Sequence, residues 1–147
     1  MNQTEYSVAP VLRDKLNFQL TIFVIVRTVF NTFYRMIYPF LSVFAKGFGV
    51  DLRTMSYAIS ARSLMGLISP ILASVADSRG RKAGMLIGTI IFTATICLLV
   101  FWPTFIAFFI SLSLGMIGYL IFVPSMQAYL GDRVPYEKRG RVLGITE

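Results

Sequence analysis

The sequence predicts an all-α integral membrane protein, with four transmembrane helices and the start of a fifth. Its 147 residues are 56% hydrophobic and only 14% charged, whereas a soluble domain is about 25% charged. No charged residue occurs between Ala83 and Gly131, a stretch that would form about 74 Å of helix. The hydrocarbon core of a bilayer is about 30 Å thick, so this stretch is expected to cross it twice.

Four apolar stretches mark the predicted spans, because each is long enough to cross a bilayer as a helix that satisfies its own backbone groups. The spans cover about residues 18–45, 54–76, 83–101 and 104–130. Trp102 and Pro103 mark the turn between the last two. Residues 1–17 are predicted to be a polar tail. Residues 18–147 are predicted to be one membrane domain, in which the fifth helix begins near residue 141.

Lysine and arginine gather on one side of the predicted spans. Nine of them lie in the tail, in the loop after the second span and in the segment after the fourth: Arg13, Lys15, Arg79, Arg81, Lys82, Arg133, Lys138, Arg139 and Arg141. The opposite side carries only Lys46 and Arg53. Cytoplasmic loops are enriched in lysine and arginine. The sequence therefore predicts a multi-pass protein of the plasma (inner) membrane with a cytoplasmic amino terminus.

Three arginines lie inside the predicted spans: Arg27, Arg35 and Arg62. An arginine at the centre of a membrane helix costs about 2.5–3.5 kcal/mol on insertion scales, so each is expected to face a cavity or a partner. In the first span an arc of about 100° is polar, and it contains Arg27, Asn31, Tyr34, Arg35 and Tyr38. The opposite arc is predicted to face lipid, and it contains Ile22, Val26, Val29, Phe30, Phe33, Ile37, Phe40 and Phe44.

Two interpretations of this polar arc stay open. Asn31 lies roughly 18 Å along the helix from Gln19, near the bilayer midplane where transporter sites lie. The arc and Arg62 are therefore candidates for a solute pathway. Alternatively, the arginines pair with acids and only hold the bundle together. No aspartate or glutamate lies inside the four spans, although Glu147 would enter the fifth.

Small residues at helical spacing predict close helix packing in the membrane. Gly84 and Gly88 form one such pair, and Ser111, Gly115 and Gly118 share a face of the fourth span.

Several kinds of site and partner are not expected. The chain has no histidine, and Cys97 is its single cysteine, so no metal site, disulfide or cofactor is predicted. The net charge is +7, but most of the charged residues lie in short loops between apolar runs, which argues against nucleic acid as a partner. A membrane phosphatidyl-group transferase would need several carboxylates to hold metal ions. The central loop offers only Asp77, and no enzymatic activity is predicted.

The loop at residues 76–82 resembles the loop between helices two and three of the major facilitator superfamily, G-x-x-x-D-R/K-x-G-R-R/K. Asp77, Gly80, Arg81 and Lys82 match this pattern, whereas Ala73 replaces its first glycine and Ser78 its first basic residue. The segments 132–135 and 139–141 resemble the family's loop between helices four and five.

The resemblance implies a partial amino-terminal six-helix bundle and secondary active transport of a small solute by alternating access. It also implies that Asp77, Gly80, Arg81 and Lys82 form a charged cytoplasmic gate. An anionic or polyhydroxylated solute would suit the arginines, and the coupling ion would be a proton or sodium. A drug exporter of the same superfamily is the first alternative. A small four-helix scaffold or accessory protein is an alternative of another class, and the reading frame after Glu147 would distinguish it.

Overall fold

The computed structural model describes residues 10–72, 80–134 and 136–146, and the regular elements in these ranges are all helices. In chain order they are α1 (Pro10–Met36), α2 (Leu41–Phe48), α3 (Leu52–Leu64), the 3₁₀ helix η1 (Met65–Ile68), α5 (Arg81–Phe101), α6 (Phe105–Arg133) and α7 (Tyr136–Thr146). Among the described residues, α5 and α6 are each long and apolar enough to cross a membrane. The bent pair α1–α2 makes a third span if it is counted as one. The predicted all-α membrane class is confirmed.

The first predicted span is bent rather than straight. Residues 18–45 are predicted to form one helix, but the structure ends α1 at Met36, and α2 continues at an angle of 71°. Pro39 lies in the break, and it has no backbone N–H to continue the hydrogen bonds of α1. At the other end, α1 begins at Pro10, within the predicted tail. A proline suits the first turn of a helix, where its missing N–H would have no partner.

The second predicted span, 54–76, is interrupted. Asp51 caps the start of α3, because its carboxylate accepts a hydrogen bond from the Thr54 backbone N–H at 3.2 Å. Such caps favour helix initiation at this position. α3 gives way to η1, and residues 69–72 are helical again. Pro70 cannot donate to the carbonyl four residues earlier, and this disfavours an uninterrupted α-helix here. Residues 73–76 lie outside the described residues.

The third and fourth predicted spans form α5 and α6, and the two helices approach each other closely at two glycines. A Cβ atom on Gly88 would lie 2.6 Å from the backbone oxygen of Gly118, and one on Gly118 would lie 2.7 Å from the oxygen of Gly88. Only hydrogen fits at both positions, so the two backbones touch. The close packing predicted from the small residues is confirmed at this crossing.

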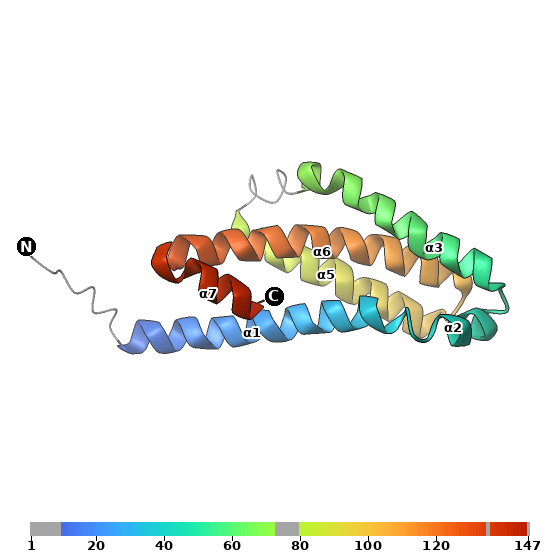
Figure 1. Ribbon diagram of the computed structural model, residues 1–147, viewed down its shortest axis with the longest axis horizontal. Helices are drawn as coiled ribbons and strands as arrows, with labels where there is room; N and C mark the ends of the chain where they lie inside the picture. Colours follow the sequence, from blue (N-terminus) through green and yellow to red (C-terminus); the bar gives the residue numbers. More distant parts are fainter. Residues whose placement is uncertain (1–9, 73–79, 135, 147) are drawn as a thin grey trace, which may run out of the picture.

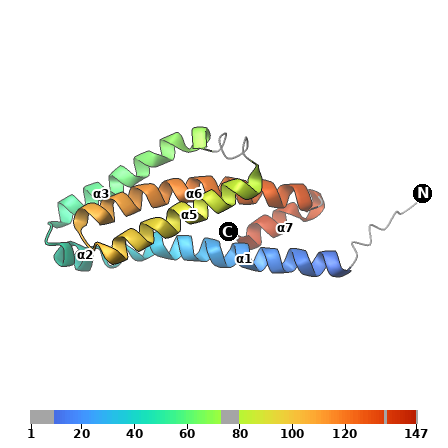
Figure 2. The same ribbon diagram turned by 180° about the vertical axis from the view of Figure 1, so that it is seen from behind.

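The helices form an elongated bundle (Figure 1). α1 and α3 flank the α5–α6 pair, and α7 folds back between α6 and α1; the view from behind shows the same order (Figure 2). α7 begins at Tyr136, earlier than the fifth helix expected near residue 141.

The apolar arc of α1 does not face lipid as a whole. Phe30 and Ile37 are only 1% and 2% exposed. The ring of Phe30 packs on Phe92 of α5 and Phe122 of α6, with centroids 3.9 and 5.2 Å apart. The prediction was wrong for these residues because lipid and a neighbouring helix both accept apolar side chains, so polarity cannot distinguish them. Val29, which is 51% exposed, does lie on the outside.

Candidate functional site

The structure divides the predicted polar arc of α1 between the bundle interior and its surface. Arg27 and Tyr34 are 5% and 8% exposed, so they point inward, whereas Tyr38 is 56% exposed. Asn31 is half-buried and Arg35 is exposed. The arc is therefore two neighbouring surfaces with different surroundings.

Arg62 of α3 reaches the inward part of the arc. Its guanidinium carbon lies 4.8 Å from the centroid of the Tyr34 ring, and its Nη2 donates a hydrogen bond to the Tyr38 hydroxyl at 3.2 Å. A cation over an aromatic face is attracted by the ring quadrupole. The Tyr119 ring of α6 lies 6.0 Å from that of Tyr34, nearly perpendicular to it. We call Tyr34, Tyr38, Arg62 and Tyr119 the Arg62 cluster.

Several polar atoms of this cluster are buried and unused. Among the described residues, Nε and Nη1 of Arg62 and the hydroxyl of Tyr34 have no hydrogen-bond partner. A guanidinium has five N–H donors and no acceptor, so most of its donors remain available. Buried donors without partners are unfavourable in an apolar interior. The cluster is thus suited to a ligand that brings hydrogen-bond acceptors.

The Tyr34 hydroxyl fits over a glycine of α6. A Cβ atom on Gly115 would lie 2.9 Å from the Tyr34 hydroxyl oxygen and 3.3 Å from Oγ1 of Thr95. Thr95 Oγ1 donates to the Phe92 carbonyl at 2.7 Å, and Ser111 donates to the Thr95 carbonyl at 2.8 Å. Sequence reasoning treated Gly115 only as a packing residue and missed Thr95. Neither Gly115 nor Thr95 carries a charge or belongs to a recognisable motif. Their roles depend on contacts with neighbouring helices, which the sequence does not reveal.

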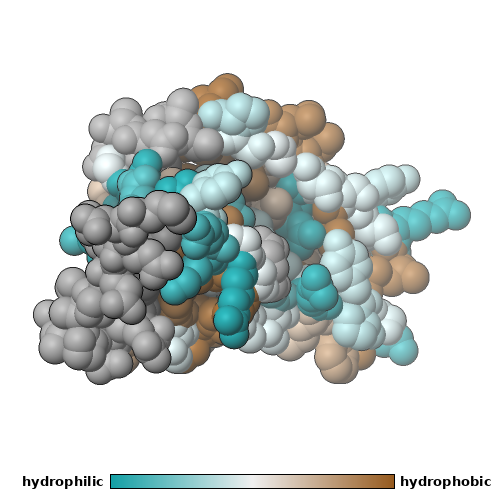
Figure 3. Space-filling view, turned by 60° about the vertical axis from the view of Figure 1, so that its left-hand side comes forward, coloured by the Kyte–Doolittle hydropathy of each residue, from teal (hydrophilic) through white to brown (hydrophobic). Residues whose placement is uncertain are grey.

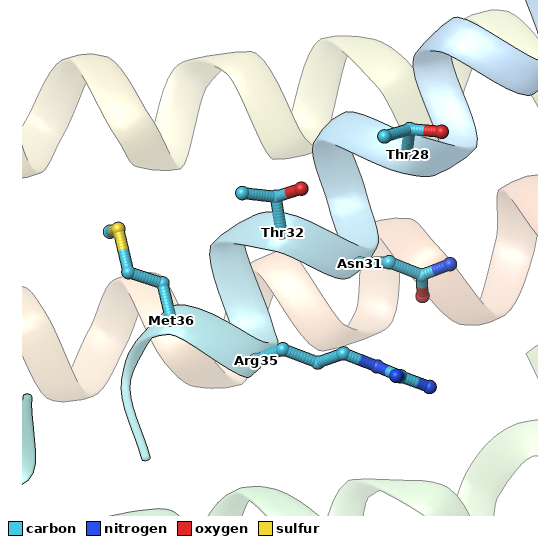
Figure 4. A pocket seen from close by; sticks show the side chains of 5 residues that line it. All are labelled: Thr28, Asn31, Thr32, Arg35 and Met36. Atoms are coloured by element: carbon cyan, nitrogen blue, oxygen red, sulfur yellow. The ribbon is translucent and has the colours of Figure 1, made fainter. Parts of the chain in front are cut away.

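The outward part of the arc lines an open pocket of about 360 Å³. Figure 4 shows that Asn31 and Arg35 extend to the same side of α1, while Thr28, Thr32 and Met36 border the pocket elsewhere. The predicted pathway residues are therefore not all brought together. Tyr34, Tyr38 and Arg62 meet, whereas Asn31 and Arg35 form a separate surface.

The described part of the predicted gate loop lies at the start of α5 and contacts α6 through the Arg81 side chain. Gly80 precedes α5 with a φ of 89°, a conformation that glycine adopts readily. Arg81 follows, and its Nη1 donates to the Ala128 carbonyl at 2.7 Å and forms an ion pair with Asp132. Sequence reasoning placed Asp132 in the second loop and did not pair it with Arg81. Asp77 lies outside the described residues.

A second set of contacts ties the same end of α6 to α1. Tyr129 and Arg133 both donate to the side-chain oxygen of Gln19, each at 3.4 Å. The Arg133 guanidinium also lies 4.2 Å above the Tyr129 ring. Lys82 lies beside this end of the bundle, in a pocket shared with Arg81 and Asp132. Within the described ranges no group of three His, Cys, Asp or Glu side chains is arranged to hold a metal ion.

Comparison with known proteins gives a family match over most of the chain. A sequence model described as Major Facilitator Superfamily matches residues 23–147. The chain is 32% identical over 111 residues to the uncharacterized MFS-type transporter YwfA of Bacillus subtilis. These residues make up 75% of the chain and 27% of YwfA. No solved structure matches significantly.

Two further relatives are named for drug resistance. The chain is 33% identical over 114 residues to the multi-drug resistance efflux pump PmrA of Streptococcus pneumoniae, covering 74% of the chain and 28% of the relative. It is 27% identical over 139 residues to multidrug resistance protein 2 of Bacillus subtilis, covering 92% of the chain and 35% of the relative. The chain thus spans about a third or less of the length of these curated relatives.

Proposed function

Because the chain belongs to the major facilitator superfamily, we propose that it is part of a secondary active transporter that moves a small solute by alternating access. The family match over residues 23–147 confirms the resemblance found in the two loops. The proposal assigns no enzymatic activity. Because the chain spans about a third of its relatives, the remaining part of the solute pathway would be contributed by other segments of the complete protein.

The Arg62 cluster carries this proposal. It places a partly buried cation with unused buried donors among tyrosines of an apolar helix bundle. Ionisable residues inside membrane segments mark solute or ion pathways as a default expectation. Arg62 also lies roughly 15 Å along α3 from Leu52, about half the thickness of the hydrocarbon core. Transporter sites lie at this depth.

The chemistry of the cluster favours a solute with acceptor groups. Guanidinium donors match carboxylate, phosphate and hydroxyl oxygens, so the proposed solute is anionic or polyhydroxylated. We keep Arg27, Asn31 and Arg35 in the proposed pathway, with the pocket of Asn31 and Arg35 as its outer part.

A drug exporter of the same superfamily is the second candidate. PmrA and multidrug resistance protein 2 are named for drug resistance or drug efflux, and three of the four residues of the Arg62 cluster are tyrosines. Aromatic rings offer stacking surfaces for planar compounds, and this supports a substrate that is both aromatic and acidic.

Orientation and gating complete the proposal. The excess of lysine and arginine supports a cytoplasmic amino terminus in the plasma (inner) membrane. In this orientation the Arg81–Asp132 pair lies on the cytoplasmic side. Asp77, Gly80, Arg81 and Lys82 then act as a gate that opens when the two halves of the transporter rock. A proton or sodium would drive transport. The coupling carboxylate would come from outside the four spans, since they contain no acidic residue.

The test is transport by the complete protein in proteoliposomes, with a panel of anionic, neutral and cationic solutes. We expect Arg62→Gln to abolish transport of the accepted solute at unchanged protein abundance. Arg53→Gln is the matched control, because Arg53 is exposed near the start of the same helix. Equal transport by the wild type and Arg62→Gln would exclude the Arg62 cluster as the solute site. Absence of transport for every solute would reject the function itself.

A further inference from the structure

A groove of about 460 Å³ lies between α1 and α5, away from the Arg62 cluster. Its lining includes Phe122 and Tyr129 of α6, which are 3% and 7% exposed and form its floor. Ile22 of α1 and Leu86 of α5 border it and are 41% and 64% exposed. The groove is therefore an apolar surface that opens to the outside of the described bundle.

One end of this groove is basic. Lys82 and Tyr129 also line a second pocket, of about 490 Å³, together with Arg81, Asp132 and Arg133. Asp132 is already paired with Arg81, so Lys82 and Arg133 carry the excess positive charge. Figure 3 brings this end of the bundle forward and shows hydrophilic and hydrophobic surfaces side by side. An apolar groove that continues into a basic pocket matches an amphiphile with an anionic head.

We propose that this groove binds an anionic phospholipid from the leaflet at the amino-terminal end of α1. The phosphate lies between Lys82 and Arg133, and an acyl chain extends along the groove from Tyr129 towards Phe122, a distance of about 10 Å along α6. Basic pockets between transmembrane helices bind anionic lipid head groups by charge complementarity. This site requires a membrane protein but does not depend on which solute is transported.

The test uses the complete protein in mild detergent, with native mass spectrometry to measure bound lipid. Dioleoyl-phosphatidylglycerol and dioleoyl-phosphatidylcholine share their acyl chains and differ in head-group charge. We expect Lys82→Gln to lower the phosphatidylglycerol affinity about fivefold, the share of one basic residue at a membrane surface, and to leave the phosphatidylcholine affinity unchanged. Leu86→Trp fills the groove and should lower both affinities.

Two matched variants serve as controls. Lys46→Gln removes an exposed lysine of α2, and Val100→Trp adds the same bulk at the far end of α5, where the valine is 71% exposed. Both should bind phosphatidylglycerol as the wild type does.

Three results would overturn the proposal. The first is equal phosphatidylglycerol affinity in the wild type and Lys82→Gln. The second is displacement of the lipid by millimolar inorganic phosphate to the same extent with and without Leu86→Trp, which indicates a simple anion site. The third is protection of Leu86→Cys, relative to Val100→Cys, from a maleimide in delipidated protein in mild detergent, where no bound lipid can shield the groove. That protection would show that another helix of the complete protein covers the groove.

Discussion

The guanidinium carbon of Arg62 lies 4.8 Å from the centroid of the Tyr34 ring, so a charge carried by α3 rests on an aromatic face of α1. α1 and α3 lie on different sides of the α5–α6 pair (Figures 1 and 2), and this contact links them across the bundle. Cation–π contacts contribute about 0.5–2 kcal/mol, depending on how well water is excluded. A solute that engages Arg62 would therefore act on the link between two helices, which is a route from binding to movement.

Arg62→Lys tests whether the shape of the guanidinium matters as well as its charge. Lysine keeps the positive charge but loses the planar set of donors and its stacking on tyrosine. Loss of a hydrogen bond to a charged group costs about 1.5–3 kcal/mol, so we expect the KM for the solute to rise roughly tenfold or more. Solute uptake into proteoliposomes measures the change.

Tyr38→Phe is the companion variant, because it removes only the hydroxyl that accepts the hydrogen bond from Arg62 Nη2. The donor is a charged guanidinium, and such a hydrogen bond contributes about 1.5–3 kcal/mol, so the expected rise in KM is roughly tenfold or more. A KM for Arg62→Lys equal to that of the wild type would show that the charge alone suffices, and that the donor geometry is irrelevant.

Gly115→Ala is expected to disturb binding more than folding. The new methyl group would lie 2.9 Å from the Tyr34 hydroxyl, which is the movable end of a side chain. The hydroxyl can shift by a few tenths of an ångström, and the Arg62 cluster shifts with it. We predict a change in solute KM with a melting temperature in detergent within a few degrees of the wild type. A large loss of melting temperature at unchanged KM would contradict this.

Gly88→Ala, in contrast, is expected to disturb folding more than solute binding. Its methyl group would lie 2.6 Å from the Gly118 carbonyl oxygen, a backbone atom that moves only if α5 and α6 separate. Overpacking of this kind costs about 1–3 kcal/mol, so a lower melting temperature and lower membrane abundance are expected. Gly47→Ala is the control, because nothing lies within 4 Å of a Cβ atom there. Equal melting temperatures for Gly88→Ala and Gly47→Ala would show that α5 and α6 pack less tightly at Gly88 than the structure indicates.

The Arg81–Asp132 pair can be tested by exchanging its charges. Both residues are partly exposed, so the pair adds little stability, about 0–1 kcal/mol after screening by solvent. Its effect should appear in transport rate instead. We expect Arg81→Asp and Asp132→Arg each to slow transport, and the double variant to recover part of the rate. Recovery stays partial because a carboxylate in place of the Arg81 guanidinium has no N–H to donate to the Ala128 carbonyl. No recovery in the double variant would mean that the two charges act separately.

Helix content and the two long apolar helices α5 and α6 could be predicted because bilayer thickness imposes a length that hydropathy reveals, whereas the 71° bend between α1 and α2 was missed. Whether an apolar helix face contacts lipid or a neighbouring helix could not be predicted. Phe30 belongs to a face that its own helix marks as apolar, yet it packs on Phe92 and Phe122. In a membrane both surroundings are apolar, so the amphipathic pattern that separates core from solvent in soluble proteins carries less information.

Contacts between residues that are distant in the chain could not be predicted from the sequence either. Arg62 was a candidate because a charge in an apolar run is costly, but its partners Tyr34 and Tyr38 lie on another helix. Arg81 and Asp132 were each found in a loop motif, and only the folded chain pairs them. A sequence pattern shows that such a residue needs a partner, and the packing of the helices determines which one it meets.

Substitution of Arg35 distinguishes a role of this residue in the proposed solute pathway from a role in structural pairing. It is exposed and lines the open pocket beside Asn31, away from the Arg62 cluster. Substitution of an exposed residue usually changes stability by no more than about 0.5 kcal/mol. Arg35→Ala is therefore expected to change the solute KM more than the amount of protein in the membrane, with Arg53→Ala as the control for loss of an exposed arginine. Transport kinetics and quantitative immunoblotting of the same membranes measure both. Unchanged KM with reduced abundance would indicate that Arg35 pairs with an acid elsewhere in the complete protein, and the solute pathway would then run through the Arg62 cluster without it.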